Sequence, residues 1–532
     1  MKRRTVIALL VAPLVSVATL LPATADDAGT PPVQASAPSG AEVDAPVPEI
    51  KWNDCDDGLQ CATVHVPLDY DEPHRATTEL SLKKHPARNG DADAGALFVN
   101  PGGPGDSAVD ELAWFVENLP EGAVDRFDVI GVDPRGVGGS SSLTCRAHGE
   151  SPDPPQTAFP ITRPEIETTL RYDRHVRRSC ATEASPIIDH MTTADTARDM
   201  DLIRQAVGDE QLTYYGISYG SVLGSTYAAM FPDRLRAMVV DGVMDPIAYT
   251  TGHRKSDARR PTTSRWGSDM GSWQTLTAAF AECDRVGPQR CPIAGEAAAT
   301  WQRVMDRLER GPATVDGEQL HHQDVVARAS GALTGVDSYH ALMRYIDATH
   351  DLLFESESGH EPANTRTYAR LRDQLADPHP EQATQEVQAP ATEGVVCADS
   401  LNPDDPRDWI DAGARADHQA PWFGRLWTWR SSLCADWPGS PADAYAGPFA
   451  TDTSAPVLLI AHLHDPSTPI SGARTLNGLL EGSRLLILDG WGHGALGESI
   501  CIGRHVEHYL VSSDLPAPGT VCQQDQHPFP RR

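Results

Sequence analysis

Basic residues are scarce in this chain of 532 residues, in which 44 lysines and arginines stand against 74 aspartates and glutamates. The formal net charge of −30 excludes nucleic acid and anionic membrane surfaces as expected partners, because both bind through clustered positive charge. The acidic surplus favours solubility, and it leaves room for a site that attracts a cationic group.

Long apolar runs are absent beyond the N-terminus. The one such run, Val6–Leu21, follows Lys2–Arg4, precedes the small residues that end at Ala25, and contains Pro13. It is shorter than the roughly 20 residues that span a bilayer. We therefore expect a secretory signal peptide over residues 1–25, cleaved near Ala25, an extracellular protein and no stable membrane insertion. Residues 26–48, rich in Ala, Pro, Asp and Ser, are expected to be a linker or a pro-segment.

The ten cysteines lack the C-x2-C spacing of a zinc site. All of them lie beyond the expected signal peptide, and an even number in an exported chain suggests disulfide bonds. A cysteine nucleophile is therefore not expected. Spacing alone leaves the connectivity open, and pairing nearest neighbours gives Cys55–Cys61, Cys145–Cys180, Cys283–Cys291, Cys397–Cys434 and Cys501–Cys522.

The chain also lacks an internal repeat and a heptad array, and it shows instead six short apolar runs that end in turns rich in Gly, Pro and Asp. These runs predict parallel strands, and residues 193–207 between them have helical spacing. Strands that alternate with helices imply a doubly wound α/β sheet, whose ligands bind at the carboxyl ends of the strands. The six runs are Ala96–Val99, Asp128–Val132, Leu212–Tyr215, Ala237–Val240, Val457–Ala461 and Leu485–Leu488.

A long helical block interrupts this alternation. From about Thr250 to Pro390 the sequence shows amphipathic stretches such as Trp301–Leu308, with no buried-strand run between them. Because strand-like runs resume at Val457, we expect the block to be inserted within one sheet as a cap over the site. The expected organisation is a core at 49–249, a helical cap at 250–445 whose C-terminal limit lies between about 390 and 445, and the rest of the core at 446–532.

The pentapeptide Gly216–Gly220 has the form G-x-S-x-G and stands between a predicted strand and a helix-like stretch. In this context the motif predicts a nucleophile elbow, with Ser218 as the nucleophile. The glycines on both sides are needed because side chains there would collide with the strand and the helix. A plain turn is an equal alternative for the pentapeptide alone, so its partners decide.

A serine nucleophile needs a histidine as base and a carboxylate that orients the histidine. In α/β-hydrolases the chain order is Ser, acid, His, each in a loop after a strand. Asp465 follows the predicted strand at 457–461, and His493 follows the one at 485–488, so they are predicted to be the acid and the base. Less well placed alternatives are the acids Asp241 and Asp245 and the histidines His462, His464, His505 and His508. Metal binding by His505 and His508 would need a third ligand, which the sequence does not identify.

Acyl transfer also needs donors for the developing oxyanion. The backbone N–H of Tyr219, directly after the serine, is the first candidate. The second is the N–H of Gly103 in the loop Asn100–Gly105, which follows a predicted strand. A phosphate-binding loop is disfavoured because no G-K-[ST] ending follows and Pro104 lacks a donor.

Five motifs in order resemble the secreted tripeptidyl aminopeptidase family of bacterial α/β-hydrolases, which are relatives of the proline iminopeptidases. The resemblance covers roughly residues 50–525. It implies a serine exopeptidase that releases short peptides from free N-termini with Ser218, Asp465 and His493, without cofactor or metal. The motifs are Val99–Gly105, Val132–Ser140, Gly216–Gly220, His464–Pro469 and Gly492–Gly494.

The sequence departs from the proline iminopeptidases at Pro101, where their oxyanion loop, His-Gly-Gly-Pro-Gly, begins with histidine. The glycine donor is intact, so the change bears on specificity more than on mechanism. In such exopeptidases acidic residues of the cap hold the substrate's α-ammonium, and Glu393 and Asp399 are the candidates here, with solvated surface charges as an equal alternative. Thr468 is expected to support the acid loop or the histidine, and Arg135 to form a structural ion pair.

Two other functions are alternatives to the exopeptidase. An exported esterase or lipase would share the triad, and a binding protein on a hydrolase scaffold would not need it. The second is disfavoured because Ser218, Asp465, His493 and both oxyanion loops are all present. The number of residues released per cut and the oligomeric state are left open by the sequence.

Overall fold

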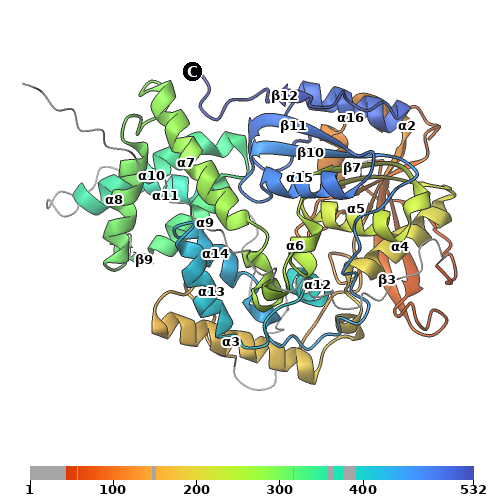
Figure 1. Cartoon of the computed structure of the whole chain (residues 1–532), viewed down its shortest axis with the longest axis horizontal. Helices are drawn as coiled ribbons and strands as arrows, with labels where there is room; N and C mark the ends of the chain where they lie inside the picture. Colours follow the sequence, from red (N-terminus) through yellow and green to blue (C-terminus); the bar gives the residue numbers. More distant parts are fainter. Residues whose placement is uncertain are drawn as a thin grey trace, which may run out of the picture. The chain divides into compact units, whose positions relative to one another are not determined.

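All six predicted strands lie in one ten-stranded sheet of the computed structural model, which describes residues 43–56, 58–146, 151–315, 317–355, 365–375 and 391–531 (Figure 1). The expected signal peptide, residues 1–25, lies outside the described residues. The strand order is β1-β2-β3-β5-β4-β6-β7-β10-β11-β12. Neighbours from β5 to β12 are parallel, whereas β1, β2 and β3 join antiparallel. The strands are β1 (Asn53–Asp54), β2 (Gln60–Pro67), β3 (Thr77–His85), β4 (Ala96–Asn100), β5 (Asp128–Val132), β6 (Leu212–Ile217), β7 (Leu235–Asp241), β10 (Val457–His464), β11 (Arg484–Trp491) and β12 (Val521–Gln523).

Strands β2 and β3 were not predicted from the sequence. In β2 the buried Val64 is flanked by the exposed Thr63 and His65, and β3 alternates in the same way around Leu80 and Leu82. An antiparallel strand with one solvated face has no continuous apolar run, which is why these two escaped the prediction.

Helices cover both faces of the sheet, as a doubly wound fold requires. One buried cluster joins the sheet to α4, α5 and α15, and another joins its opposite face to α1, α2 and α16 (Figure 1). The predicted helix over 193–207 is confirmed, and the Thr192 side chain caps its first turn. These helices are α1 (Leu112–Asn118), α2 (Glu121–Arg126), α4 (Thr193–Val207), α5 (Tyr219–Met230), α15 (Ile470–Leu479) and α16 (Ile500–Ser512).

The chain between β7 and β10 is mainly helical and has a buried cluster of its own, with Trp301, Tyr345 and Trp409 at its centre. A short hairpin of β8 (Ala313–Val315) and β9 (Glu318–Leu320) interrupts the helices. No helix among the described residues is long and apolar enough to cross a membrane. The helices of this insertion are α6 (Pro246–Thr250), α7 (Ser268–Val286), α8 (Ala297–Glu309), α9 (His322–Ala332), α10 (Tyr339–Glu355), α11 (Thr365–Gln374), α12 (Ala391–Asp399), α13 (Asp408–Asp417) and α14 (Phe423–Trp429).

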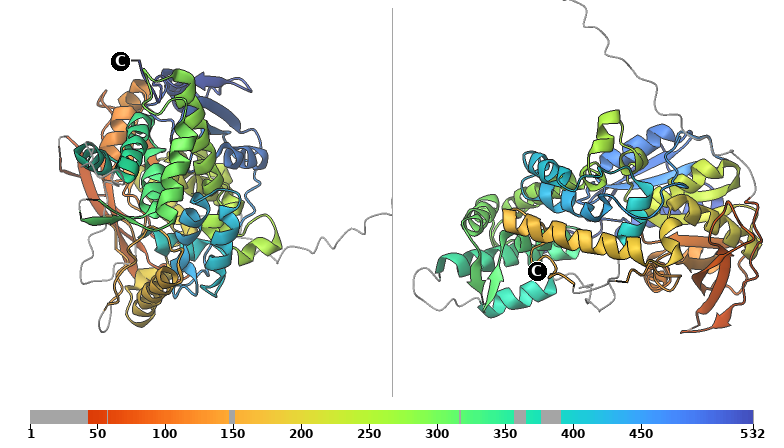
Figure 2. Two further views of the ribbon diagram at one scale, coloured as in Figure 1. Left: turned by 90° about the vertical axis from the view of Figure 1, so that its left-hand side faces the viewer. Right: turned by 90° about the horizontal axis from the view of Figure 1, so that it is seen from below.

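A long helix from an earlier part of the chain joins the insertion. Helix α3 (Arg163–Thr182) starts with a capping box between Thr162 and Glu165. Its residues Ile166 and Leu170 pack against the buried cluster of the insertion, and α3 is the long gold helix at the bottom of Figure 1 and in the right-hand view of Figure 2. The cavity described below is therefore walled partly by residues that precede the predicted cap.

Five disulfide bonds tie the fold together locally. They join Cys55 to Cys61, Cys145 to Cys180, Cys283 to Cys291, Cys397 to Cys434 and Cys501 to Cys522. These are the nearest-neighbour pairs, and each closes a loop of fewer than 40 residues, the widest spanning 37.

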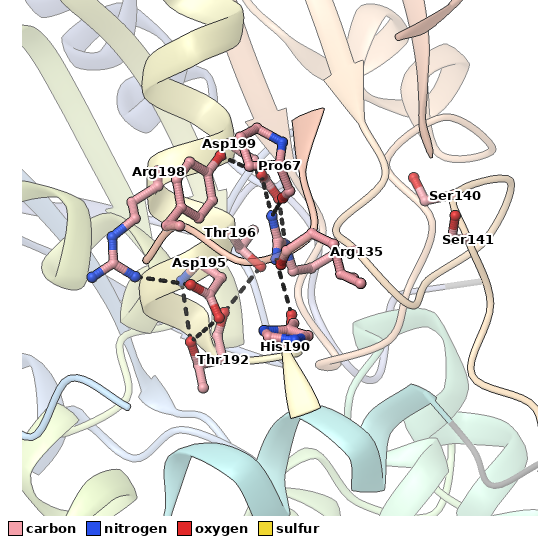
Figure 3. A network of polar contacts seen from close by, with 12 residues as sticks. Pro67, Arg135, Ser140, Ser141, His190, Thr192, Asp195, Thr196, Arg198 and Asp199 are labelled. Carbon is pink, nitrogen blue, oxygen red and sulfur yellow. Dashed lines mark hydrogen bonds and ion pairs between the residues drawn. The ribbon is translucent and has the colours of Figure 1, made fainter. Parts of the chain in front are cut away.

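Arg135 forms the structural ion pair that the sequence suggested. Its guanidinium is fully buried and donates to both carboxylate oxygens of Asp199 on α4, at 2.6 and 2.8 Å (Figure 3). It also donates to the backbone carbonyls of Pro67, Leu68 and His190. One buried arginine thereby holds the end of β2 against α4, and it lies outside the site described next.

Candidate active site

Ser218 stands at the sharp turn between β6 and α5 with φ 58° and ψ −121°. This backbone conformation is rare for a residue with a side chain, and it is typical of a strained nucleophile elbow. A Cβ added at Gly216 would lie 2.5 Å from the Gly220 carbonyl oxygen, and one at Gly220 would lie 2.9 Å from the Asn100 carbonyl oxygen. The Ser218 N–H donates to the Asp241 carbonyl at 2.9 Å, which anchors the turn to β7.

Asp465 lies directly after β10, and its carboxylate is buried and fully engaged. One oxygen, Oδ1, accepts the N–H groups of Ser467 and Thr468, both at 2.8 Å. The other, Oδ2, accepts the Thr468 hydroxyl at 2.8 Å. Nδ1 of His493, after β11, lies 3.0 Å from Oδ2 and 3.1 Å from Oδ1. A histidine that donates from Nδ1 to this carboxylate has Nε2 free to accept a proton.

The charges of this pair reinforce one another. Burial raises the pKa of Asp465, but the charge and hydrogen bond of His493 outweigh it, so the pKa lies below its ordinary value. Burial lowers the pKa of His493, but the charge and hydrogen bond of Asp465 raise it above its ordinary value. The carboxylate is therefore placed to strengthen the histidine as a base and to stabilise it once it is protonated.

The alternative acids have other tasks. Asp241, at the end of β7, is fully buried and accepts the N–H groups of Ala495 and Leu496, at 2.7 and 3.2 Å. It thereby holds the loop that follows the histidine, and burial raises its pKa to about 6. Asp245 caps α6 and pairs with His253 at 2.7 Å. In the described part of the chain neither carboxylate is hydrogen bonded to His493.

The other histidines do not replace His493. His462 is fully buried, and burial lowers its pKa to about 4, so it is neutral. His464 stacks on Trp491 with ring centroids 4.0 Å apart. In the described part of the chain neither His462 nor His464 is hydrogen bonded to the Asp465 carboxylate.

Two groups of side chains in the described residues have the spacing of metal ligands. In one group the two cysteines are bonded to each other, and in the other Asp195 pairs with Arg198 at 2.8 Å. Neither group lines the cavity that contains Ser218. The groups are Cys501 with His505 and Cys522, and His190 with Asp195 and Asp443.

The predicted oxyanion loop lies against the elbow. A Cβ added at Gly102, where φ is +109°, would lie 2.9 Å from the Ser218 Cβ and 3.0 Å from the Tyr219 backbone nitrogen. Only glycine allows this approach. Gly103 lines the same cavity as Ser218, which leaves its N–H and that of Tyr219 as the donor candidates.

A cavity of about 880 Å³ opens over Ser218 and His493. Apart from the loops that contain the triad, its lining comes from the inserted helices, from α3 and from the segment that leads into α3. Aromatic rings are frequent in this lining, and the volume suits an extended ligand of several residues. The aromatic lining residues are Phe159, Tyr172, Trp266, Trp427 and Trp429.

The two predicted ammonium ligands are separated by the structure. Glu393 lines the cavity, beside Thr392, whose hydroxyl donates to the Pro104 carbonyl at 2.7 Å. Asp399 does not line the cavity. Its carboxylate accepts the Thr193 N–H at 2.8 Å and the Tyr249 hydroxyl at 3.0 Å. Burial raises its pKa to about 7. Six residues on a helix turn the side chain by about 240°, so the two acids face different sides of α12.

Family models match two parts of the chain. Residues 95–265 match the alpha/beta hydrolase fold, and residues 420–522 match the TAP-like protein family. The two matches contain Ser218 and the pair of Asp465 and His493, respectively.

Curated relatives extend the similarity over nearly the whole chain. Serine protease Hip1 of Mycobacterium tuberculosis is 28% identical over 501 residues, which cover 87% of each chain. The tripeptidyl aminopeptidase of Streptomyces lividans is 28% identical over 501 residues, covering 90% of this chain and 88% of the relative. Carboxylesterase B of Mycobacterium tuberculosis is 31% identical over 514 residues, covering 91% of this chain and 92% of the relative. The chain is therefore a serine hydrolase that belongs to the tripeptidyl aminopeptidase (TAP-like) family of α/β hydrolases.

Proposed function

We propose that this protein is a serine exopeptidase that cleaves peptides near their free N-termini and releases tripeptides, as the relative named a tripeptidyl aminopeptidase suggests. Ser218 is the nucleophile, His493 the base and Asp465 the orienting acid. One observation carries the proposal: a serine in a strained elbow shares a cavity with a histidine whose Nδ1 lies 3.0 Å from a buried carboxylate.

The reaction follows from these positions. Nε2 of His493 takes the proton of the Ser218 hydroxyl as the oxygen attacks the scissile carbonyl. The N–H groups of Gly103 and Tyr219 stabilise the tetrahedral anion. His493 then protonates the leaving amine, and a water molecule releases the acyl fragment by the same steps in reverse. Asp465 stays ionised throughout and stabilises the imidazolium.

Two features support a peptide with a free N-terminus as the substrate. Relatives at 28% identity are named a tripeptidyl aminopeptidase and a serine protease. The cavity also contains the carboxylate of Glu393 near the oxyanion loop, and carboxylates suit the recognition of an ammonium group.

A secreted carboxylesterase is the second candidate, because the relative at 31% identity is named carboxylesterase B. The same triad would serve, since ester and amide hydrolysis share the acyl-enzyme. A serine-directed label tests the nucleophile that both functions share.

Matched chromogenic substrates separate these functions. We would compare a tripeptide anilide with a free amine, its N-acetylated form and a short-chain ester. The proposal predicts that the free-amine peptide is cleaved and that acetylation removes most of the activity. Turnover of the ester alone would move the protein to the esterases, and the absence of both turnover and labelling would contradict Ser218 as a working nucleophile.

We also propose that the protein acts outside the cytosol. Five disulfide bonds suit an oxidising compartment, and the N-terminal sequence has the three parts of a signal peptide. N-terminal sequencing of the protein recovered from culture medium tests this, with a new terminus expected near Ala25.

A further inference from the structure

Helix α3 contributes an acidic residue to the cavity that the sequence did not single out. Asp173 lines the same cavity as Ser218, and so do its neighbours Thr169 and Tyr172. Asp173 is only 4% exposed. A carboxyl group in such a position must be satisfied by a partner, because burial of an unpaired charge is costly.

Asp173 has an incomplete set of partners. Its Oδ2 has no hydrogen-bond partner among the described residues. Arg177, one turn along α3, donates to the Ser432 carbonyl at 3.5 Å. Burial raises the pKa of Asp173 to about 6, and a hydrogen bond from Ser432 and the charge of Arg177 offset this effect only in part. The group therefore lacks a full countercharge.

The position of Asp173 relative to the elbow is set by α12. Thr392, at the start of α12, is hydrogen bonded to the oxyanion loop. Cys397, five residues and about 7.5 Å further along the helix axis, is bonded to Cys434, with their Cα atoms 4.9 Å apart. Ser432, two residues before Cys434, is the hydrogen-bond partner of Asp173.

Glu393 and Asp173 are connected to the oxyanion loop by routes of different length. Glu393 adjoins Thr392 at that loop, whereas the route to Asp173 runs along about 7.5 Å of α12, across the 4.9 Å between the Cα atoms of Cys397 and Cys434, and on through Ser432. Three extended residues span about 10 Å. An ammonium group at Asp173 would therefore suit an acyl fragment of several residues, and one at Glu393 a shorter fragment.

We infer that Asp173 binds an ammonium group of the substrate and so selects for acyl fragments of about three residues that end in a free amine. The inference rests on the proposed aminopeptidase function and adds the residue that recognises the N-terminus. The Asp173 carboxylate accepts an N–H of the ammonium group, and the charge that arrives supplies the missing countercharge. Asp173 is then a determinant of specificity, with no part in the bond-breaking steps.

The test is steady-state kinetics of the full mature protein and three variants. Asp173→Asn removes the charge with little change in shape, Glu393→Gln does the same at the competing site, and Glu167→Gln is a control on the exposed face of α3. The substrates are a free-amine tripeptide anilide, its N-acetylated form and a short-chain ester. An N-acetylated peptide with lysine as its first residue shows whether a side-chain ammonium serves as well.

The inference predicts that Asp173→Asn lowers kcat/KM for the free-amine tripeptide by about 10- to 100-fold, mainly through KM. Hydrolysis of the ester should stay unchanged, which also shows that the variant is folded. Asp173→Ala, which removes the carboxylate by truncation, should have the same selective effect if the asparagine variant does not fold. Glu167→Gln should behave like the wild type.

Other results would overturn the inference. An equal loss on the free-amine and acetylated substrates would mean that Asp173 is structural, and a selective loss in Glu393→Gln alone would place the ammonium at Glu393. A wild-type protein that hydrolyses only the ester would contradict the aminopeptidase function itself, which separates that failure from a failure of the Asp173 assignment.

Discussion

The hydroxyl of Thr468 donates a 2.8 Å hydrogen bond to Oδ2 of Asp465, the oxygen that His493 Nδ1 approaches to 3.0 Å. The same threonine lies 3.1 Å from Nδ1 itself. Because Oδ1 is held by two backbone N–H groups, the carboxylate has one orientation available. Thr468 is therefore a positioning residue for the proposed acid and base.

Thr468→Val should lower kcat by about tenfold with little change in KM, because a hydrogen bond to a charged group is lost at constant side-chain shape. Steady-state kinetics on the best substrate measures both constants. Thr468→Ser retains the hydroxyl and should restore most of the rate. A valine variant as active as the wild type would show that the backbone N–H groups alone orient the carboxylate.

The pH dependence should report the coupling of His493 to Asp465. The histidine must be neutral to act as a base, so activity should fall as the pH drops through its pKa, which Asp465 holds above the ordinary 6.5. In Asp465→Asn the raising charge is gone and burial remains, so the acidic limb of kcat/KM should move to lower pH. The maximal rate should fall by about 10⁴-fold. A limb that stays in place would assign it to another group.

Gly102→Ala should lower kcat/KM by about 100-fold or more, because the new methyl group would lie 2.5 Å from the Ile217 carbonyl and push the loop away from Ser218. Gly90→Ala is the matched control. Gly90 also has positive φ but has nothing within 4 Å of an added Cβ, so it tests backbone strain without the clash. Equal activity losses in the two variants would contradict the argument.

Asp199→Asn should reduce the free energy of unfolding by about 3–5 kcal/mol, because it leaves the buried Arg135 without its countercharge. Denaturant unfolding measures this, and activity per folded molecule should be unchanged. Glu167→Gln, which breaks the exposed pair with Arg163, should leave stability unchanged. A stable Asp199→Asn protein would mean that the carbonyl groups around Arg135 are sufficient partners.

Much of the sheet was predictable because its parallel strands are buried on both faces. Each leaves a continuous apolar run, and β6, β10 and β11 are followed by loops that contain Ser218, Asp465 and His493. The order of these motifs along the chain reflects the strand order of the fold. The alternating strands β2 and β3 leave no such run, so they were missed.

The substrate side of the cavity was less predictable, since its residues are brought together by tertiary packing. Asp399 shares α12 with Glu393 but faces Thr193 and Tyr249. Asp173 comes from a helix more than 200 residues away in sequence from α12. No local motif marks it, although the amphipathic pattern and capping box of α3 are present in the sequence.

Turnover of a free-amine tripeptide anilide by Ser218→Ala, measured beside the wild type, tests the central claim most directly. The account predicts a fall of at least about 10⁴-fold in kcat, with the circular dichroism spectrum of the folded protein unchanged. A folded Ser218→Ala protein that retains most of the wild-type activity would contradict the assignment of Ser218 as the nucleophile.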